Sequence, residues 1–298
     1  MNISKLTALR FSIIAITCFA IPADAGLITG LDSEHLALAD EHPYVGWYEV
    51  DDGVNGTTFG ASGVLIDPHW VLMSAHGALS VDNDLSSTYD SFRFGFGPNF
   101  NTNRGENMLA SELFLHPSYR DVGTGYDLAL LRFDSPFETV TPINRFRGNV
   151  VAGAQGDIVG FGRLETQGST DQALTGDRRA GTDLIETVGA FPVSPEQFMI
   201  RVDGRFGGPS YNLLQMKGTK GDSGGGWIVG EDLWGITSNA ASTITAFSKL
   251  DNEWIDTTMA NNPVSGVPEP SALLLLSTVL PIAIFIKRRR TRRACHHV

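Results

Sequence analysis

Residues 62–76 read SGVLIDPHWVLMSAH, and this stretch decides the fold class. Two short apolar runs, 63–66 and 70–73, lie on either side of an Asp-Pro turn. Strands of four to seven residues with frequent turns are typical of a β-sandwich or barrel. The second run ends in Ser-Ala-His, so His76 is expected just past a strand, where a scaffold can hold its imidazole rigidly.

The same pattern of short apolar runs and turns continues on both sides. Further strands are predicted at 44–50, 92–96, 128–133, 158–161, 226–229, 233–237 and 244–247. One helical pattern covers 249–259, with Leu250, Trp254 and Ile255 on one face. Thirty-three glycines and 14 prolines favour turns over a helical bundle. The sequence therefore predicts an all-β fold with one C-terminal helix.

Composition and charge exclude several classes of protein. Of the 298 residues, 42% are hydrophobic and 18% charged, which rules out wholesale disorder. Without residues 1–25 and 267–298, the chain keeps 14 basic and 31 acidic residues, a net charge of −17. This charge argues against a nucleic-acid partner and suits a soluble exported body. Cys18 and Cys295 lie outside this part, which excludes disulfides, thiolate chemistry and cysteine-ligated zinc from it.

The N-terminal residues 1–25 are typical of a secretory signal peptide. Lys5 and Arg10 give a positive start before an apolar run at 11–21, and Ala-Asp-Ala at 23–25 is a small-x-small cleavage site. The alternative is a membrane helix, but the run is short for that purpose. Export of the remaining chain is therefore expected.

The C-terminal residues 267–293 carry a second targeting pattern. Val-Pro-Glu-Pro-Ser at 267–271 precedes an apolar run at 272–286 and a basic cluster at 287–293. This order resembles the PEP-CTERM sorting signal of Gram-negative bacteria. The resemblance implies processing by an exosortase-type membrane enzyme and delivery to the cell envelope, cell surface or medium. The alternative is a single-span tail anchor with its basic end in the cytoplasm. Residues 261–266 are interpreted as a linker, and 294–298 as a short tail.

The sharpest chemical motif is GDSGGG at residues 221–226. A nucleophilic serine needs an exposed hydroxyl and nearby backbone N–H groups for the oxyanion of a tetrahedral intermediate. Glycines on both sides of Ser223 let the chain turn tightly and let substrate approach. Taken alone, the motif also fits a flexible glycine loop.

Two other motifs supply what a nucleophilic serine lacks. His76 can act as a base, although an isolated histidine more often is an ordinary hydrogen-bonded side chain, which is the role expected for His69. Asp127 opens the apolar strand 128–133, where a partly buried carboxylate demands a hydrogen-bonding partner. An imidazole N–H is a suitable partner and would fix the tautomer that accepts the serine proton. A turn or capping aspartate is the alternative.

Together the three motifs resemble those of the trypsin/chymotrypsin-like serine protease family, in the order His, Asp, Ser and separated by 51 and 96 residues. The segments 42–45, 159–163, 235–238 and 254–255 resemble further family motifs, so the likeness covers about residues 27–260. It implies two six-stranded antiparallel β-barrels with the active site in the crevice between them, in a protease domain at 26–260. The implied activity is that of a serine endopeptidase acting on proteins or peptides through an acyl-enzyme, without a cofactor.

The resemblance also implies a role for each motif residue. Ser223 is the expected nucleophile, His76 the general base and then acid, and Asp127 the group that orients the imidazole. The N–H groups of Gly221 and Ser223 would form the oxyanion hole. Ser238 would help to hold substrate in an extended pose.

The chain departs from the family in how it holds two loops. Ala61 and Gly77 occupy the positions of a disulfide that usually flanks the histidine strand, so packing must hold that loop. In animal members, a newly cut N-terminus pairs with the aspartate that corresponds to Asp222. Ile28-Thr29-Gly30 resembles that inserted start only weakly, and no Lys or Arg precedes Ile28. Asp222 is therefore expected to have a structural role, with activation by cleavage left open.

The substrate pocket also departs from trypsin-like members. Lys217, six residues before Ser223, stands where those members carry an acid at the pocket floor. Ala240 and Thr245 replace two glycines that line the pocket in members accepting large side chains. These residues predict small or acidic side chains before the scissile bond. Residues 82–84 could ligate calcium, but a solvated acidic turn is favoured and no metal site is predicted.

Two functions compete with proteolysis. A catalytically silent relative could serve as a surface binding or matrix protein, although all three motif positions are filled. A serine esterase could use the same residues, but the setting of Ser223 is not the Gly-x-Ser-x-Gly elbow of hydrolase-fold esterases.

Overall fold

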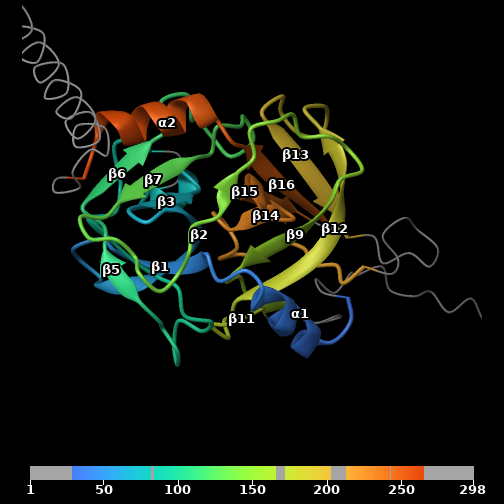
Figure 1. Cartoon of the computed structure of the whole chain (residues 1–298), viewed down its shortest axis with the longest axis horizontal. Coiled ribbons are helices and arrows are strands. Elements are labelled where there is room, and N and C mark those ends of the chain that lie inside the picture. The colour runs from blue at the N-terminus through green and yellow to red at the C-terminus, as the bar shows by residue number, and fades with distance from the viewer. Residues whose placement is uncertain (1–28, 82–83, 166–171, 203–212, 242, 265–298) are drawn as a thin grey trace, which may run out of the picture.

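The computed structural model describes residues 29–81, 84–165, 172–202, 213–241 and 243–264, which form two β-barrels side by side (Figure 1). The predicted signal peptide at 1–25 and the PEP-CTERM-like segment with its tail at 267–298 lie outside these residues, as does Ile28. Within the described ranges, no helix is both long and apolar enough to cross a membrane.

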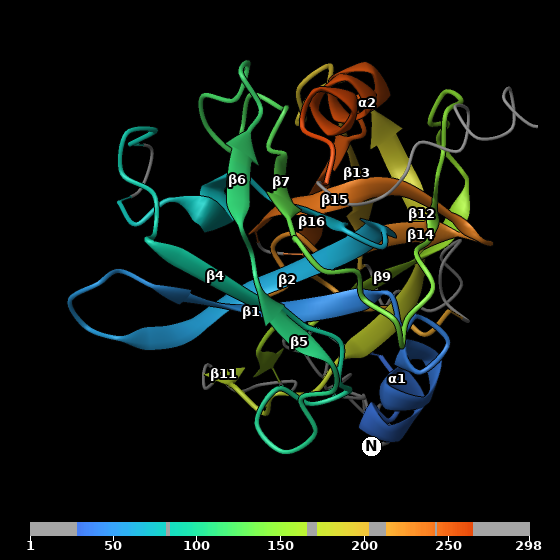
Figure 2. The ribbon, with the colours of Figure 1, turned by 60° about the vertical axis from the view of Figure 1, so that its left-hand side comes forward.

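The first barrel has the strand order β5-β4-β1-β2-β3-β7-β6, with every neighbouring pair antiparallel. The bounds are β1 Val45–Asp51, β2 Thr57–Asp67, β3 Trp70–Met73, β4 Ser91–Gly95, β5 Asn107–Leu109, β6 Glu112–Leu115 and β7 Ala129–Arg132. The ends of this sheet are joined because β5 and β6 are two pieces of one bent segment (Figure 2). Ala110 donates its N–H to Phe92 and Ser111 to Arg132, so the segment changes partner at the bend.

The second barrel has the order β14-β9-β12-β13-β16-β15-β8, and a further β14–β15 pairing closes six of these strands into a ring. The bounds are β8 Asn144–Arg145, β9 Gln155–Gly160, β12 Arg179–Val188, β13 Gln197–Arg201, β14 Gly226–Val229, β15 Asp232–Ala241 and β16 Ile244–Lys249. A separate hairpin joins β10 Leu164–Glu165 to β11 Gln172–Ala173.

The prediction of a mostly β fold with two barrels and a C-terminal helix is confirmed, with two corrections. The first barrel divides one strand into β5 and β6, because the chain bends between sheet partners. The second barrel carries β8 as an additional strand, and β8 runs parallel to β15, so the sheet is not wholly antiparallel.

An apolar layer between the barrels fixes their contact. It joins β1, β2, β3 and β7 of the first barrel to β9, β12, β14 and β15 of the second, and one buried residue from each helix completes it. Its fully or nearly fully buried members are Ala39, Val45, Val64, Ile66, Trp70, Leu72, Leu128, Leu130, Ile143, Val159, Ala180, Ile228, Leu233, Ile236 and Ile255. Burial of these side chains removes their apolar surface from water, and this holds the facing barrel walls together.

The C-terminal helix α2, Asn252–Asn261, lies against the first barrel beside β6 and β7 (Figure 1). It starts later than the predicted 249–259, because Lys249 still belongs to β16 and Asp251 caps the helix by accepting the Trp254 N–H at 3.0 Å. Such a cap satisfies an N–H that the first turn leaves without a helical partner. The side chain of Ile255 is fully buried in the layer between the barrels.

Replacing Ile255 with alanine should lower the free energy of unfolding by about 2–5 kcal/mol, because the buried side chain leaves a cavity in this layer. Urea unfolding followed by tryptophan fluorescence measures the change. Thr257→Ala, on the exposed face of the same helix, is the matched control and should change the free energy by less than about 0.5 kcal/mol. Equal effects from the two substitutions would contradict the placement of α2.

Candidate active site

Three side chains from remote parts of the chain form one hydrogen-bonded row. His76 begins a short 3-10 helix, His76–Ala78, after β3, Asp127 lies just before β7, and Ser223 lies in the loop before β14. The His76 Nδ1 atom is 2.7 Å from Asp127 Oδ2, and its Nε2 atom is 2.8 Å from Ser223 Oγ. The structure thus brings together the residues predicted as base, orienting group and nucleophile.

The Asp127 carboxylate is fully buried and is surrounded by donors. It accepts the backbone N–H of His76 at 2.9 Å and the hydroxyl of Ser238 at 2.5 Å, besides the imidazole. An ionised carboxylate only accepts hydrogen bonds, so the neutral imidazole carries its proton on Nδ1. The lone pair on Nε2 then faces the Ser223 hydroxyl, which is the tautomer required to take up its proton.

Ser238, on β15, has a different contact from the one the sequence suggests. Its hydroxyl is buried and donates to Asp127, so its side chain serves the carboxylate. The prediction that Ser238 holds extended substrate stays a prediction, and it now concerns the main chain of β15.

The loop that carries Ser223, residues 219–225, is called the serine loop. Two of its backbone N–H groups are available as donors. Gly221 has φ +105°, a conformation that side chains disfavour. Among the described residues, no acceptor pairs with the N–H of Gly221 or of Ser223. These are the two N–H groups predicted to bind an oxyanion, and that role stays a prediction.

The buried carboxylate of Asp222 holds the serine loop by accepting backbone hydrogen bonds. It accepts the N–H of Gly162 and the N–H of Thr219, each at 2.7 Å, and burial raises the pKa of Asp222. A Cβ at position 162 would lie 2.0 Å from Asp222 Oδ2, so only glycine allows this approach. No cation of the described residues forms an ion pair with Asp222, whose partners are neutral donors.

The loop after His76 is held where the family would have a disulfide. The Tyr48 hydroxyl donates to the Gly77 carbonyl at 3.0 Å, and Tyr48 pairs across the sheet with Ala61. The ring of Tyr48 is fully buried. One tyrosine thus links the two positions that lack cysteines, by packing and one hydrogen bond.

The predicted pocket residues lie around one close contact. Thr245 is fully buried, pairs with Ala240 across β15 and β16, and accepts the Gly218 N–H at 2.8 Å. A Cβ on Gly218 would come within 2.9 Å of the Thr245 methyl group, so this side chain fills the space beside Gly218. Lys217 is half-buried and directly precedes this contact.

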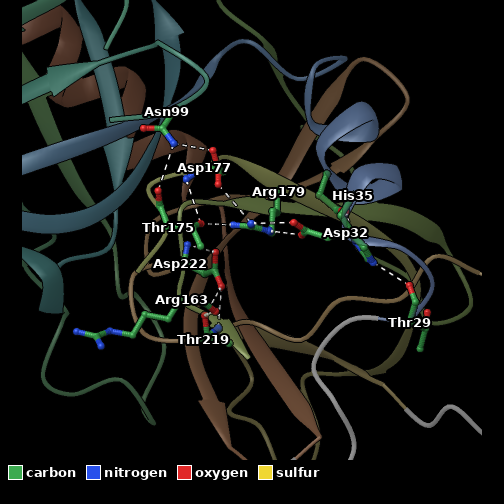
Figure 3. A network of polar contacts seen from close by, with 12 residues as sticks. Thr29, Asp32, His35, Asn99, Arg163, Thr175, Asp177, Arg179, Thr219 and Asp222 are labelled. Atoms are coloured by element: carbon green, nitrogen blue, oxygen red, sulfur yellow. Dashed lines mark hydrogen bonds and ion pairs between the residues drawn. The ribbon is translucent and has the colours of Figure 1, made fainter. Parts of the chain in front are cut away.

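The helix α1, Asp32–Ala39, is a feature that the sequence did not indicate, and it is attached to β12 by polar contacts (Figure 3). The Arg179 guanidinium contacts Asp32 through two nitrogens, at 2.6 and 3.1 Å. The buried His35 contacts the Ala180 carbonyl at 2.7 Å and the Thr29 carbonyl at 2.8 Å. Thr29 in turn donates its N–H to Gln215, which leads toward the serine loop.

The acidic turn at 82–84 is described only at Asp84. Its carboxylate accepts the Ser86 N–H and hydroxyl, at 3.0 and 2.6 Å. Residues 82 and 83 lie outside the described part, and among the described residues no three side chains of the metal-binding types lie together.

Comparisons with known proteins agree with this architecture. The family model Trypsin matches residues 35–255. Serine protease 28 of Mus musculus is 30% identical over 91 residues, which are 30% of this chain and 32% of that protein. The chain thus matches about a third of the length of this curated relative. A solved structure described as "Structure of GrC" has a TM-score of 0.57 at 18% identity and covers 79% of this chain and 98% of its own. At this identity the likeness concerns the fold.

Replacing Asp32 with asparagine should loosen α1 and lower the free energy of unfolding at pH 7 by about 1 kcal/mol, since the pair is partly exposed. The hydrogen bond from Arg179 lowers the pKa of Asp32 in the folded protein. Its stabilisation is therefore present above the unfolded pKa of about 4 and is lost as the pH falls through the folded pKa.

Urea unfolding of both proteins between pH 7 and pH 3 measures this dependence, and the difference between them should shrink toward the acid end. Asp40→Asn is the control. This exposed carboxylate lies 3.9 Å from Arg178, beyond hydrogen-bond distance, so its ion pair contributes little to stability. A difference that stays constant with pH would refute the role of the ion pair.

Proposed function

Because this chain belongs to the trypsin family, whose model matches residues 35–255, we propose that it is a serine endopeptidase that hydrolyses peptide bonds through Ser223, His76 and Asp127. The observation that carries the proposal is the continuous row of hydrogen bonds from Asp127 Oδ2 through the imidazole to Ser223 Oγ, at 2.7 and 2.8 Å. Each of the three groups has the chemistry that its position in the row requires.

In the proposed reaction, Ser223 Oγ attacks the scissile carbonyl carbon while its proton passes to His76 Nε2. The negative charge on the carbonyl oxygen is met by the N–H groups of Gly221 and Ser223, which have no other acceptor among the described residues. His76 then gives its proton to the leaving amine as the C–N bond breaks. Water then attacks the acyl carbon while His76 Nε2 takes its proton, and the bond to Ser223 Oγ breaks as that proton passes to Oγ, which releases the acid product. Asp127 stays ionised and stabilises the imidazolium.

The buried position of Asp127 favours this reaction over a silent binding role. A charge without solvent is costly unless donors surround it, and this one has three. An esterase remains the second candidate, since the same three groups can hydrolyse esters, and it is distinguished by the experiment below.

For specificity, we propose that the protein cleaves after small or acidic residues. Thr245 fills the space beside Gly218, which supports a shallow pocket. Lys217, directly before Gly218, occupies the position at which trypsin-like members carry an acid, and a cation there would disfavour Lys or Arg in the substrate.

We also propose that the protein is exported from a Gram-negative bacterial cell and sorted to its surface. The proposal rests on the signal-like residues 1–25 and the PEP-CTERM-like residues 267–293, with an exosortase-type enzyme as the processing partner and membrane contact through the C-terminal segment. Mass spectrometry of both termini of the protein recovered from cell envelope and medium tests it. Intact termini in a cytoplasmic fraction would refute it.

Ser223→Ala should abolish labelling by a fluorophosphonate and reduce casein hydrolysis by about 10⁴- to 10⁶-fold, because the covalent intermediate cannot form. Ser111→Ala, at an exposed serine, is the control and should retain both activities. Labelling of the natural protein without proteolysis would favour the esterase, and neither activity would favour the binding protein.

Thr245→Gly should widen the pocket and raise the ratio of kcat/KM for Phe over Ala before the scissile bond by about 10-fold or more. Cleavage of a peptide library, quantified for the natural protein and the variant, measures the change. Cleavage by the natural protein only after Arg or Lys would contradict the proposed preference.

A further inference from the structure

Ser62, on β2, is a buried polar residue that none of the roles above uses. Its side chain has no exposure to solvent, and its hydroxyl lies at the junction of three segments. The hydroxyl donates to the Gly221 carbonyl at 2.8 Å and accepts the Phe161 N–H, also at 2.8 Å. The Ser62 N–H donates to the Ser223 carbonyl at 2.9 Å. One residue of the first barrel thus holds the serine loop on both sides of Asp222.

The peptide unit between Gly221 and Asp222 is the one that these contacts fix. Its carbonyl accepts the Ser62 hydroxyl, and its N–H donates to the Thr219 carbonyl at 3.0 Å. The two N–H groups proposed to bind the oxyanion belong to the peptide units immediately before and after it. Their directions therefore depend on the orientation of this unit.

Gly221 makes that orientation sensitive to its partners. Glycine occupies positive and negative φ with similar ease, so the observed φ of +105° is not enforced by a side chain. Hydrogen bonds to buried backbone groups are costly to lose, and the Ser62 hydroxyl supplies one to the carbonyl of this residue. The loop is thus held by contacts from outside it.

We propose that Ser62 is a positioning residue for the oxyanion hole: its hydroxyl, through the Gly221 carbonyl, holds the N–H groups of Gly221 and Ser223 in the direction that the reaction requires. The inference rests on the proposed function for its kinetic consequence. It predicts that loss of the Ser62 hydroxyl lowers kcat and leaves KM nearly unchanged, because the oxyanion contact strengthens in the transition state while substrate binding is little affected.

Ser62→Ala removes one oxygen and creates no steric conflict, so the variant is expected to fold. Its kcat for a peptide substrate should fall by about 10-fold or more, and by no more than the 10²–10³-fold that complete loss of an oxyanion donor causes, while KM changes by less than about twofold. The inhibition constant of a peptide boronate, which forms a tetrahedral adduct, should rise by the same factor as kcat falls. Ser62→Thr keeps the hydroxyl and should restore part of kcat.

Ser74→Ala is the matched control. Ser74 is equally buried in the first barrel, and its hydroxyl has no hydrogen-bond partner among the described residues. This variant should keep kcat and the boronate constant. A kcat of Ser62→Ala within twofold of the natural protein, or a change in KM alone, would overturn the proposal.

A second measurement does not depend on activity. Amide hydrogen exchange of residues 219–225 should be faster in Ser62→Ala than in the natural protein and unchanged in Ser74→Ala. Unchanged exchange in Ser62→Ala would overturn the proposed positioning of the serine loop by Ser62, even for an inactive protein. Faster exchange in Ser62→Ala, together with an inactive natural protein, would support the positioning of the loop by Ser62 and refute the proposed function.

Discussion

The burial of the Asp127 carboxyl group is the constraint on which the site depends. A carboxylate without solvent exposure needs donors, and these come from both barrels: His76 belongs to the first, and Ser238 to the second. The backbone N–H of Asp127 also donates to Ser248 on β16, at 3.2 Å. The apolar layer brings the barrel walls into contact, but it is not directional. The hydrogen bonds of this one side chain fix how the two walls are aligned at the candidate site.

The serine loop obeys a similar rule, in that its shape is determined by segments remote from it. Consecutive N–H groups of Phe161 and Gly162 lead to Ser62 and to the Asp222 carboxylate, respectively. The loop therefore takes its conformation from β2 and from the end of β9. In animal members of the family, the aspartate at this position pairs with an inserted N-terminus. Here the Asp222 carboxylate accepts hydrogen bonds from the N–H groups of Thr219 and Gly162.

The sequence allowed much of the fold to be predicted, because the predicted strands β3 and β14 depend only on local apolar runs. The three motif residues were found because each stands in a distinctive local setting. The helix α1 was missed because it has no apolar face, and polar contacts with Arg179 and Ala180 hold it. Ser62 was missed because its significance depends on Gly221, 159 residues away in the chain. Contacts over such separations leave no periodic trace in a sequence.

The bend between β5 and β6 has a consequence for behaviour at high concentration. An open sheet presents rows of unpaired backbone groups on which another chain can add a strand. In the first barrel, one bent segment pairs with β4 before the bend and with β7 after it, so both lateral margins of that sheet are occupied. The second barrel reaches the same state through β14 and β15. Neither barrel, within the described residues, offers a long free margin that could template edge-to-edge aggregation.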